Sequence, residues 1–178
     1  MNYYKELLDI LNGNWEKDIE LKRGEYLVNE GEVHTNLYYV EEGSMRVFIY
    51  DEVEEHTIRF GYPNSLITAL DSFLTKQPTN FFIQAIKKCK LKCISKSSYD
   101  NLLRSDPNYT ALWLKMMEVF VYQQIEREID LLTFSPTKRF ERLFRRSPQV
   151  FQEIPQKYIA SYLRMTPETL SRILKNID

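Results

Sequence analysis

Residues 154–176, IPQKYIASYLRMTPETLSRILKN, carry the pattern that decides the fold of the C-terminal part of the chain. Pro155 suits the first turn of a helix over residues 156–163, and Arg164-Met165 would form the turn that follows it. The run Thr166-Pro167-Glu168 then supplies an N-cap, a proline at the first helical position and an acid in the first turn. We therefore predict two short helices joined by a turn, which is the layout of a helix-turn-helix.

The apolar residues of this segment are spaced so that they meet between the two helices, and the small Ala160 permits a close crossing: Ile159, Leu163, Met165, Leu170 and Ile173. Any αα-hairpin shares much of this pattern, so packing alone does not specify DNA binding. In a DNA-binding unit the second helix enters the major groove and its N-terminal residues contact the bases.

Candidate DNA contacts follow from that geometry. Arg172 is the best candidate for a bidentate contact with guanine, and Glu168 could accept a hydrogen bond from cytosine N4. Gln156 and Lys157, at the start of the first helix, are better placed for phosphate. The full set of candidates is Gln156, Lys157, Thr166, Pro167, Glu168, Thr169, Ser171 and Arg172.

The net charge of −1 would by itself argue against a nucleic-acid-binding protein. The charge is unevenly divided, however. Residues 1–134 contain 15 Lys/Arg and 21 Asp/Glu, a net charge of −6, whereas residues 135–178 contain 9 and 4, a net charge of +5. Positive charge thus collects around the predicted helix-turn-helix, which favours DNA as its partner.

Residues 18–97 consist of short runs rich in β-branched and aromatic residues. Gly24, Gly31 and Gly43 fall between runs, where a positive φ costs glycine less than other residues. The acidic residues 51–55 are expected to form a solvated hairpin tip. We predict an antiparallel β-roll or sandwich, with strands at residues 26–28, 37–40, 45–50, 56–60, 81–83 and 91–94.

A short helix is predicted at residues 97–105, and a long helix at residues 108–132 should follow the cap-like Asp106-Pro107. Its apolar residues recur every three or four positions. This stripe is wide enough to contact both its own β-domain and the same helix of a second copy, although purely intramolecular packing is the alternative. The residues assigned to the dimer contact are Trp113, Met116, Met117, Phe120, Gln124 and Arg127.

Ser135-Pro136 opens another helix over residues 137–146, in which Phe140, Leu143 and Phe144 are interleaved with five bases. We expect an amphipathic helix with a basic outer face, part of it close to phosphate. The sequence as a whole predicts an α+β protein with three parts: a β-roll in residues 1–106, a dimerisation helix in residues 107–133 and a helix-turn-helix domain in residues 134–178.

The chain offers few groups for catalysis, metals or cofactors. Cys89 and Cys93 should share one face of a strand, about 13 Å apart, which is too far for an unstrained disulfide. Two thiolates do not make an iron–sulfur site, and His34 and His56 lack ligand-like neighbours. We expect no catalytic site, no metal and no cofactor.

No apolar run approaches the length of a membrane helix. The first ten residues include Lys5, Glu6 and Asp9 and lack the pattern of a secretion signal. We expect a cytoplasmic protein with no membrane partner.

The chain resembles the Crp/Fnr family of bacterial transcription regulators along nearly its whole length. The resemblance is carried by residues 23–32 (RGEYLVNEGE), residues 37–47 (LYYVEEGSMRV) and the segments 158–163 and 166–173 within the helix-turn-helix. It implies a cyclic-nucleotide-binding-like β-roll, a long dimer helix and a C-terminal DNA-binding unit. The partners that it implies are double-stranded DNA, a second copy of the chain and RNA polymerase.

The cassette that binds the cyclic phosphate in nucleotide-binding members departs from the family pattern here. Those members carry a Gly-Glu pair and, about ten residues later, an Arg-Ser or Arg-Thr pair. The matching segments are residues 64–74 and 78–82, and no arginine lies between Arg59 and Arg104. The degenerate cassette residues are Asp71, Ser72, Thr79 and Asn80. Because the guanidinium that would neutralise the phosphate is missing, we expect neither cyclic AMP nor cyclic GMP to bind.

Two further departures affect the DNA-binding unit. Relatives often have glycine in the turn where this chain has Arg164, so the turn either holds Arg164 at a strained positive φ or differs in geometry. The sequence ends at Asp178, where many relatives have a β-hairpin wing. We therefore expect modest DNA affinity that relies on dimerisation.

The function predicted from these patterns is sequence-specific DNA binding by a homodimeric transcription regulator that does not respond to cyclic AMP or cyclic GMP. The alternative is a β-roll sensor or interaction protein whose C-terminal helices no longer bind DNA. A cupin-like enzyme shares the strand pattern but needs a His/Glu metal cluster that the two isolated histidines do not provide. The sequence gives no identity for an effector, an operator or a target gene.

Overall fold

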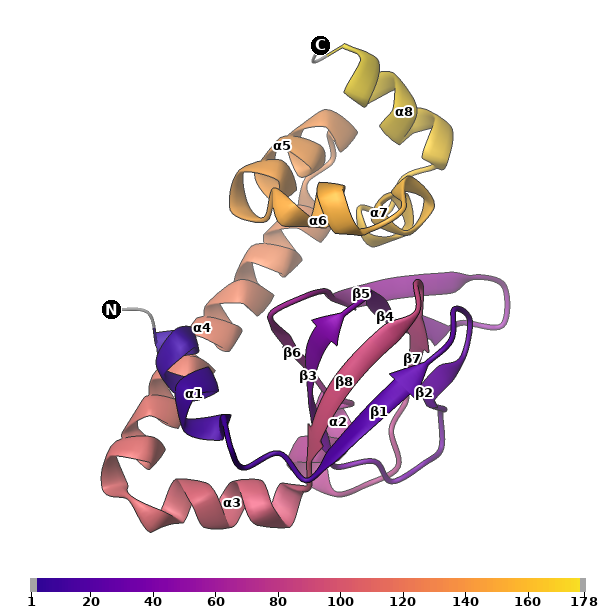
Figure 1. Ribbon diagram of the computed structural model, residues 1–178. Coiled ribbons are helices and arrows are strands. Elements are labelled where there is room, and N and C mark those ends of the chain that lie inside the picture. The colour runs from indigo at the N-terminus through magenta and orange to yellow at the C-terminus, as the bar shows by residue number, and fades with distance from the viewer. Residues whose placement is uncertain (1–2, 177–178) are drawn as a thin grey trace.

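The computed structural model describes residues 3–176, which form a β-roll, a long helix beside it and a group of short helices at the far end of that helix (Figure 1). The long helix is α4 (Pro107–Leu132), and it runs from the base of the β-roll to the C-terminal helices. The predicted α+β class and the β-roll are therefore confirmed.

Two four-stranded antiparallel sheets make up the β-roll. The strand order is β1-β8-β3-β6 in one sheet and β2-β7-β4-β5 in the other. The strands are β1 (Lys17–Leu21), β2 (Tyr26–Val28), β3 (Leu37–Glu42), β4 (Met45–Tyr50), β5 (Glu55–Gly61), β6 (Ser65–Ile67), β7 (Phe82–Ala85) and β8 (Cys89–Ile94). Inward-facing residues of both sheets pack into one core that contains Val40, Val47, Ile83 and Leu91.

The turn between β3 and β4 depends on a glycine. Gly43 has a φ of +88°, and a Cβ at this position would lie 2.1 Å from the carbonyl oxygen of Lys88. No side chain fits there without moving the backbone of the neighbouring strand. Cys89 packs beside the same turn, and both cysteines are buried free thiols on one face of β8, as the alternation predicted.

Three helices attach α4 to the β-roll. These are α1 (Tyr3–Leu11), α2 (Leu70–Thr75) and α3 (Lys96–Ser105). Leu7 and Leu11 of α1 pack with Phe73 of α2, Tyr99 of α3 and Met116 of α4 in a second core cluster. The first half of α4 is consequently fixed to its own chain.

The C-terminal unit, as we call residues 136–175, consists of α5 (Pro136–Arg146), α6 (Gln149–Glu153), α7 (Gln156–Tyr162) and α8 (Pro167–Lys175). Its longer helices begin as the sequence predicted. Ser135 and Thr166 accept hydrogen bonds at 3.4 and 3.2 Å from the backbone N–H groups of Lys138 and Thr169, and a proline follows each cap. Asp106 caps α4 in the same way.

The predicted strands and helices are all present, and Gly24, Gly31 and Gly43 all have a positive φ. Five elements were not predicted from the sequence: the short strands β1 and β6, the short helices α2 and α6, and the longer helix α1. No helix within residues 3–176 is both long enough and apolar enough to cross a membrane. The expectation about a C-terminal wing concerns the end of the chain, outside the described residues.

Candidate nucleic-acid interface

Helices α7 and α8 pack against each other and against α5 through a small apolar core. The side chains of Ile159, Leu163 and Leu170 are completely buried between the two helices. Phe140 and Leu143 of α5 pack in the same cluster. Met165 is only half-buried at the edge of this core. The apolar residues thus pack two short helices against each other across a turn, as their spacing predicted.

The turn between α7 and α8 has the hydrogen-bond pattern of a Schellman motif. The backbone N–H of Met165 donates to the carbonyl of Ala160 at 3.0 Å, and that of Arg164 donates to Ser161 at 3.1 Å. This motif requires a left-handed residue after the helix, and Arg164 has a φ of +53°. Of the two alternatives for this turn, the structure has the strained arginine rather than a different turn geometry.

Arg139 of α5 holds that turn in place. Its guanidinium donates to the carbonyl oxygens of Leu163 at 2.8 Å and Arg164 at 3.0 Å, and also to those of Thr133 at 2.7 Å and Phe134 at 3.0 Å. One nearly buried side chain thus satisfies carbonyl groups at the end of α4 and at the α7–α8 turn. Sequence analysis missed this role because nothing local distinguishes Arg139 from its exposed neighbours.

The predicted DNA contacts of α8 lie on its outer side. Pro167, Glu168 and Arg172 are exposed, whereas Thr169 and Ser171 are half-buried. The exposed Thr166 is the N-cap, so its hydroxyl already accepts from the N–H of Thr169. Gln156 and Lys157 are exposed at the start of α7.

Glu168 is an anion placed beside a cation. A hydrogen bond from its own backbone N–H, the Thr166 hydroxyl and the nearby charge of Arg172 hold the pKa of its carboxyl below the usual range. A carboxylate next to a guanidinium on one exposed helix face presents both an acceptor and a donor. Such a pair can distinguish cytosine from guanine in the major groove.

The expected basic outer face of α5 is partly wrong. Arg139 is buried, as described, and Arg142 and Arg146 both point to the completely buried carboxylate of Asp130 on α4. Their guanidinium groups also bind Glu126, at 3.0 and 3.5 Å. Three of the nine bases in residues 135–178 are therefore used inside the protein, because a buried carboxylate and unpaired carbonyls require donors. The bases of the C-terminal unit that remain exposed are Lys138, Arg145, Lys157, Arg164, Arg172 and Lys175.

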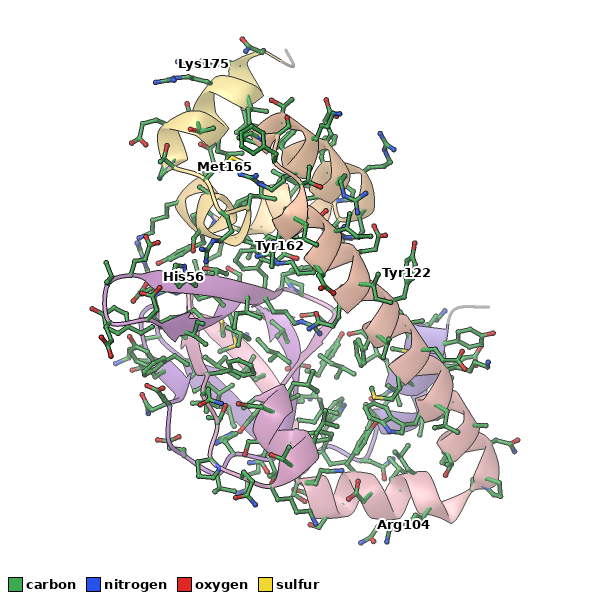
Figure 2. The ribbon with its side chains drawn as sticks, turned by 180° about the vertical axis from the view of Figure 1, so that it is seen from behind. His56, Arg104, Tyr122, Tyr162, Met165 and Lys175 are labelled. Carbon is green, nitrogen blue, oxygen red and sulfur yellow. The ribbon has the colours of Figure 1, made fainter. Side chains whose placement is uncertain are left out.

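The C-terminal unit contacts the β-roll through β5. The Ser161 hydroxyl donates to the carbonyl of Glu55 and accepts from the N–H of Thr57, both at 3.1 Å. The rings of Phe60 and Tyr162 lie 5.3 Å apart between the two parts. Figure 2 shows Tyr162 at this boundary and Met165 on the far side of it.

The residues that we assigned to the dimer contact mostly face their own chain. Trp113, Met116 and Phe120 pack with α1 and α3, and Met117 is half-buried. Gln124 accepts a hydrogen bond from Arg59, and the guanidinium of Arg127 lies over the Tyr162 ring. The exposed apolar residues of α4 are Leu114, Val119, Val121, Tyr122, Ile125, Ile129, Leu131 and Leu132. The period of three to four predicted the stripe correctly but did not show which side of it faces inward.

The degenerate cassette is closed by its own hydrogen bonds. The Asp71 carboxylate, in the first turn of α2, accepts from the Thr79 hydroxyl at 2.6 Å and from the N–H groups of Ser72 and Asn80 at 2.7 and 2.8 Å. The side chains of Ser72 and Thr79 are buried. A negative charge thus already occupies the donors that could otherwise bind an anion.

No group of three or more His, Cys, Asp or Glu side chains in residues 3–176 is arranged to hold a metal ion. His34 contacts the Tyr38 hydroxyl, and His56 contacts Asp51 and Arg164. Both histidines therefore have structural partners.

The matches to known proteins identify the same fold. The family model for the cyclic nucleotide-binding domain matches residues 18–106. A mutant of CooA from Carboxydothermus hydrogenoformans is similar over 96% of this chain and 83% of its own, with 16% identity and a TM-score of 0.73. FixK2 from Bradyrhizobium japonicum covers 90% and 83%, with 18% identity and the same TM-score.

The c-di-GMP-responsive global regulator CLP of Xanthomonas campestris is similar over 97% of this chain and 91% of its own, with 13% identity and a TM-score of 0.67. At these identities the likeness shows a shared fold of β-roll, long helix and C-terminal helices, which is the fold of Crp/Fnr regulators. No curated protein matches the sequence.

The left-handed turn residue can be tested by comparing two substitutions. Arg164→Gly should have a free energy of unfolding about 1 kcal/mol higher than Arg164→Ala, because only glycine adopts this φ without a steric cost. Comparing the two variants cancels the loss of the arginine side chain, and urea denaturation gives the difference.

The same pair of substitutions at Lys115, an exposed position inside α4, is the control. There alanine should be the more stable variant by about 1 kcal/mol, since a regular helix disfavours glycine. If alanine equals or exceeds glycine at position 164 as well, the left-handed turn is not a strained feature of this protein.

Proposed function

The chain belongs to the cyclic nucleotide-binding domain family, and we propose that it is a homodimeric, sequence-specific DNA-binding regulator of transcription. The observation that carries this proposal is α8 itself. It is a capped helix of nine residues on a buried apolar base, with Glu168 and Arg172 exposed on its outer side.

The DNA contacts fall into two groups in this proposal. Glu168, Thr169, Ser171 and Arg172, together with Pro167, face base edges in the major groove. Gln156, Lys157 and the start of α8 at Thr166 contact phosphate. A role in transcription is supported by proteins with this fold, among them the catabolite activator protein of Thermus thermophilus and the sensor domain of the transcriptional regulator DNR of Pseudomonas aeruginosa.

The dimer surface that we propose is the outer face of α4. Leu114, Val121, Ile125 and Leu132 recur at steps of seven, four and seven residues and are 59, 60, 48 and 78% exposed. This is the spacing of a coiled-coil seam, and single helices seldom leave such a row in water. Figure 2 shows Tyr122, beside this row, on the side of α4 that points away from the β-roll.

In this proposal residues 1–106 are the β-roll sensor domain, residues 107–133 the dimerisation helix and residues 134–178 the DNA-binding domain. Double-stranded DNA in the cytoplasm is the direct partner, with RNA polymerase as the partner through which transcription is regulated. No membrane partner is proposed.

A second candidate function rests on the inward-facing arginines. Arg139, Arg142 and Arg146 are not available for phosphate, which lowers the electrostatic attraction to DNA. A β-roll sensor or interaction protein whose C-terminal helices do not bind DNA is consistent with that loss.

Selection from a random-sequence DNA pool separates the two candidates. The full chain should select a palindrome with half-sites about one helical turn apart, and its affinity should fall between two salt concentrations. Arg172→Ala should weaken binding to the selected site by about 1–3 kcal/mol and relax preference at one base pair of each half-site.

Arg104→Ala is the matched control, since Arg104 is an exposed arginine on α3, far from α8. It should leave the selected motif unchanged. A wild-type chain that shows no sequence preference and no salt-dependent binding supports the sensor candidate. A motif that survives Arg172→Ala intact excludes guanine recognition by this residue.

If the outer face of α4 forms the dimer, a charged residue introduced there should prevent dimerisation. Ile125→Glu should convert a dimer into a monomer and reduce DNA affinity at least tenfold, because two carboxylates would be buried against each other. Sedimentation equilibrium measures the mass, and Val53→Glu is the control. Val53 is an equally apolar residue, 84% exposed at the β4–β5 hairpin tip. A dimer that persists in Ile125→Glu rules out this face.

The closed cassette predicts no response to cyclic nucleotides. Calorimetric titration with cyclic AMP or cyclic GMP should show no saturable binding at micromolar concentrations, because Asp71 already occupies the donors at α2 and no arginine is present in the cassette. Saturable binding that is lost in Thr79→Val would show instead that the cassette is functional.

A further inference from the structure

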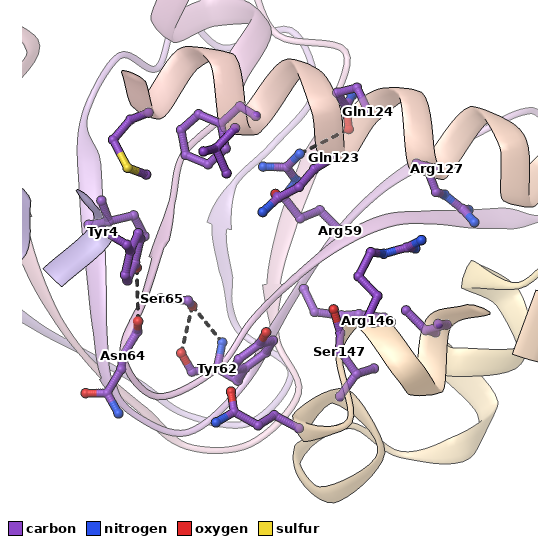
Figure 3. A pocket seen from close by; sticks show the side chains of 18 of the residues that line it. Tyr4, Arg59, Tyr62, Asn64, Ser65, Gln123, Gln124, Arg127, Arg146 and Ser147 are labelled. Carbon is purple, nitrogen blue, oxygen red and sulfur yellow. Dashed lines mark hydrogen bonds between the residues drawn. The ribbon is translucent and has the colours of Figure 1, made fainter. Parts of the chain in front are cut away.

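A cavity of about 800 Å³ lies at the junction of the β-roll, α4 and the C-terminal unit (Figure 3). We call it the junction pocket. Its walls come from α1, the β5–β6 segment, α4, and the segment from α5 to α6, with Tyr162 of α7. None of the cassette residues Asp71, Ser72, Thr79 and Asn80 lines it, so it is separate from the nucleotide cassette.

The lining is positively charged. It contains Lys5, Arg59, Arg127 and Arg146, whereas no Asp or Glu among the described residues lines it. Arg146 is already bound to Asp130 and Glu126, but Arg59 and Arg127 form no ion pair with any residue in 3–176. Two unpaired guanidinium groups in a partly enclosed cavity point to an anionic ligand.

The hydrogen bonds of the two arginines leave donors available. The Nη2 of Arg59 donates to the Gln124 side chain at 3.1 Å. Arg127 lies 3.7 Å from the centre of the Tyr162 ring, and its Nη1 is buried without a hydrogen-bond partner. The aromatic ring fixes the orientation of Arg127 but does not satisfy its N–H groups, and burial lowers the pKa of both guanidinium groups, although arginine stays charged.

The lining also contains several aromatic residues. Tyr4, Phe60, Tyr62, Phe120 and Tyr162 line the same cavity, and in Figure 3 Tyr4 and Tyr62 lie toward the opposite end from Arg127. Burial raises the pKa of Tyr62, so that its hydroxyl is neutral and adds no competing negative charge. A cavity of this size accommodates a small organic molecule with a flat apolar body.

We propose that the junction pocket binds an aromatic carboxylate, with the acidic group between Arg59 and Arg127 and the ring among the tyrosines and phenylalanines. The carboxylate supplies the acceptors that Arg127 lacks and joins a residue of β5 to a residue of α4. This inference does not depend on DNA binding, because it concerns the free chain.

Calorimetric titration of the full-length chain with naphthalene-2-carboxylate tests the proposal. One molecule should bind per chain, and the neutral naphthalene-2-carboxamide should bind about tenfold or more weakly, since it has the same shape without the charge. Arg127→Gln should reduce carboxylate affinity by a similar factor and leave carboxamide affinity unchanged.

Arg127→Gln should still fold, with a small loss of stability, because it removes the contact with the Tyr162 ring whereas Nη1 has no hydrogen bond to lose. Arg59→Gln is the second variant and should give the same loss if Arg127→Gln does not fold. Arg104→Gln, at an exposed arginine outside the pocket, should bind like the wild type. Equal affinity for the acid and the amide, or acid binding that survives both pocket variants, overturns the proposal, and so does the absence of any saturable binding.

Discussion

The arrangement of the C-terminal unit depends on how Arg139 satisfies four carbonyl oxygens. Two of these carbonyls, of Thr133 and Phe134, directly follow α4, and the other two, of Leu163 and Arg164, belong to the α7–α8 turn. One guanidinium meets both sets and thereby fixes the end of α4 to the turn that orients α8. Asp130 adds a second connection, since Arg142 and Arg146 of α5 bind its buried carboxylate. These contacts fix the C-terminal unit, and α8 with it, to the end of α4.

The helix α4 therefore connects the β-roll to the C-terminal unit that carries α8. The first half of α4 is held by α1 and α3, whereas the second half borders the junction pocket and then ends at Arg139. Ser161 of α7 gives a second, direct contact between the β-roll and the C-terminal unit, because its hydroxyl is hydrogen-bonded to Glu55 and Thr57 of β5. The Ser161 contact and the junction pocket both involve β5, whereas α2 contributes Phe73 to the core cluster that holds the first half of α4.

The parts of the fold that sequence predicted are those specified by local chemistry. The Thr166-Pro167 cap, the glycine at position 43 and the apolar spacing of residues 159–173 each determine their own structure within a few residues. The side of α4 that faces inward and the arginines of α5 that become buried are decided by distant partners, α1 and Asp130 among them. The helical period of α4 predicts that an apolar stripe exists, but it does not predict which side of the helix faces the β-roll. The row of bases on α5 likewise does not show that Arg139 is the one that binds the unpaired carbonyls. The junction pocket was missed for the same reason, because its walls are far apart in the sequence.

In the proposed complex with DNA, the internal use of arginine favours binding by two copies of the chain. Each phosphate contact contributes through counterion release, and the three arginines turned inward contribute nothing. The exposed bases that remain lie on α5, α7 and α8 and in the α7–α8 turn. A single unit would therefore bind weakly, and sequence selectivity would require two units held at a fixed separation, so that the second binds at a high effective concentration. The apolar row on the outer face of α4 is well placed to hold the two units together. The end of α4 is joined through Arg139 to the turn that precedes α8.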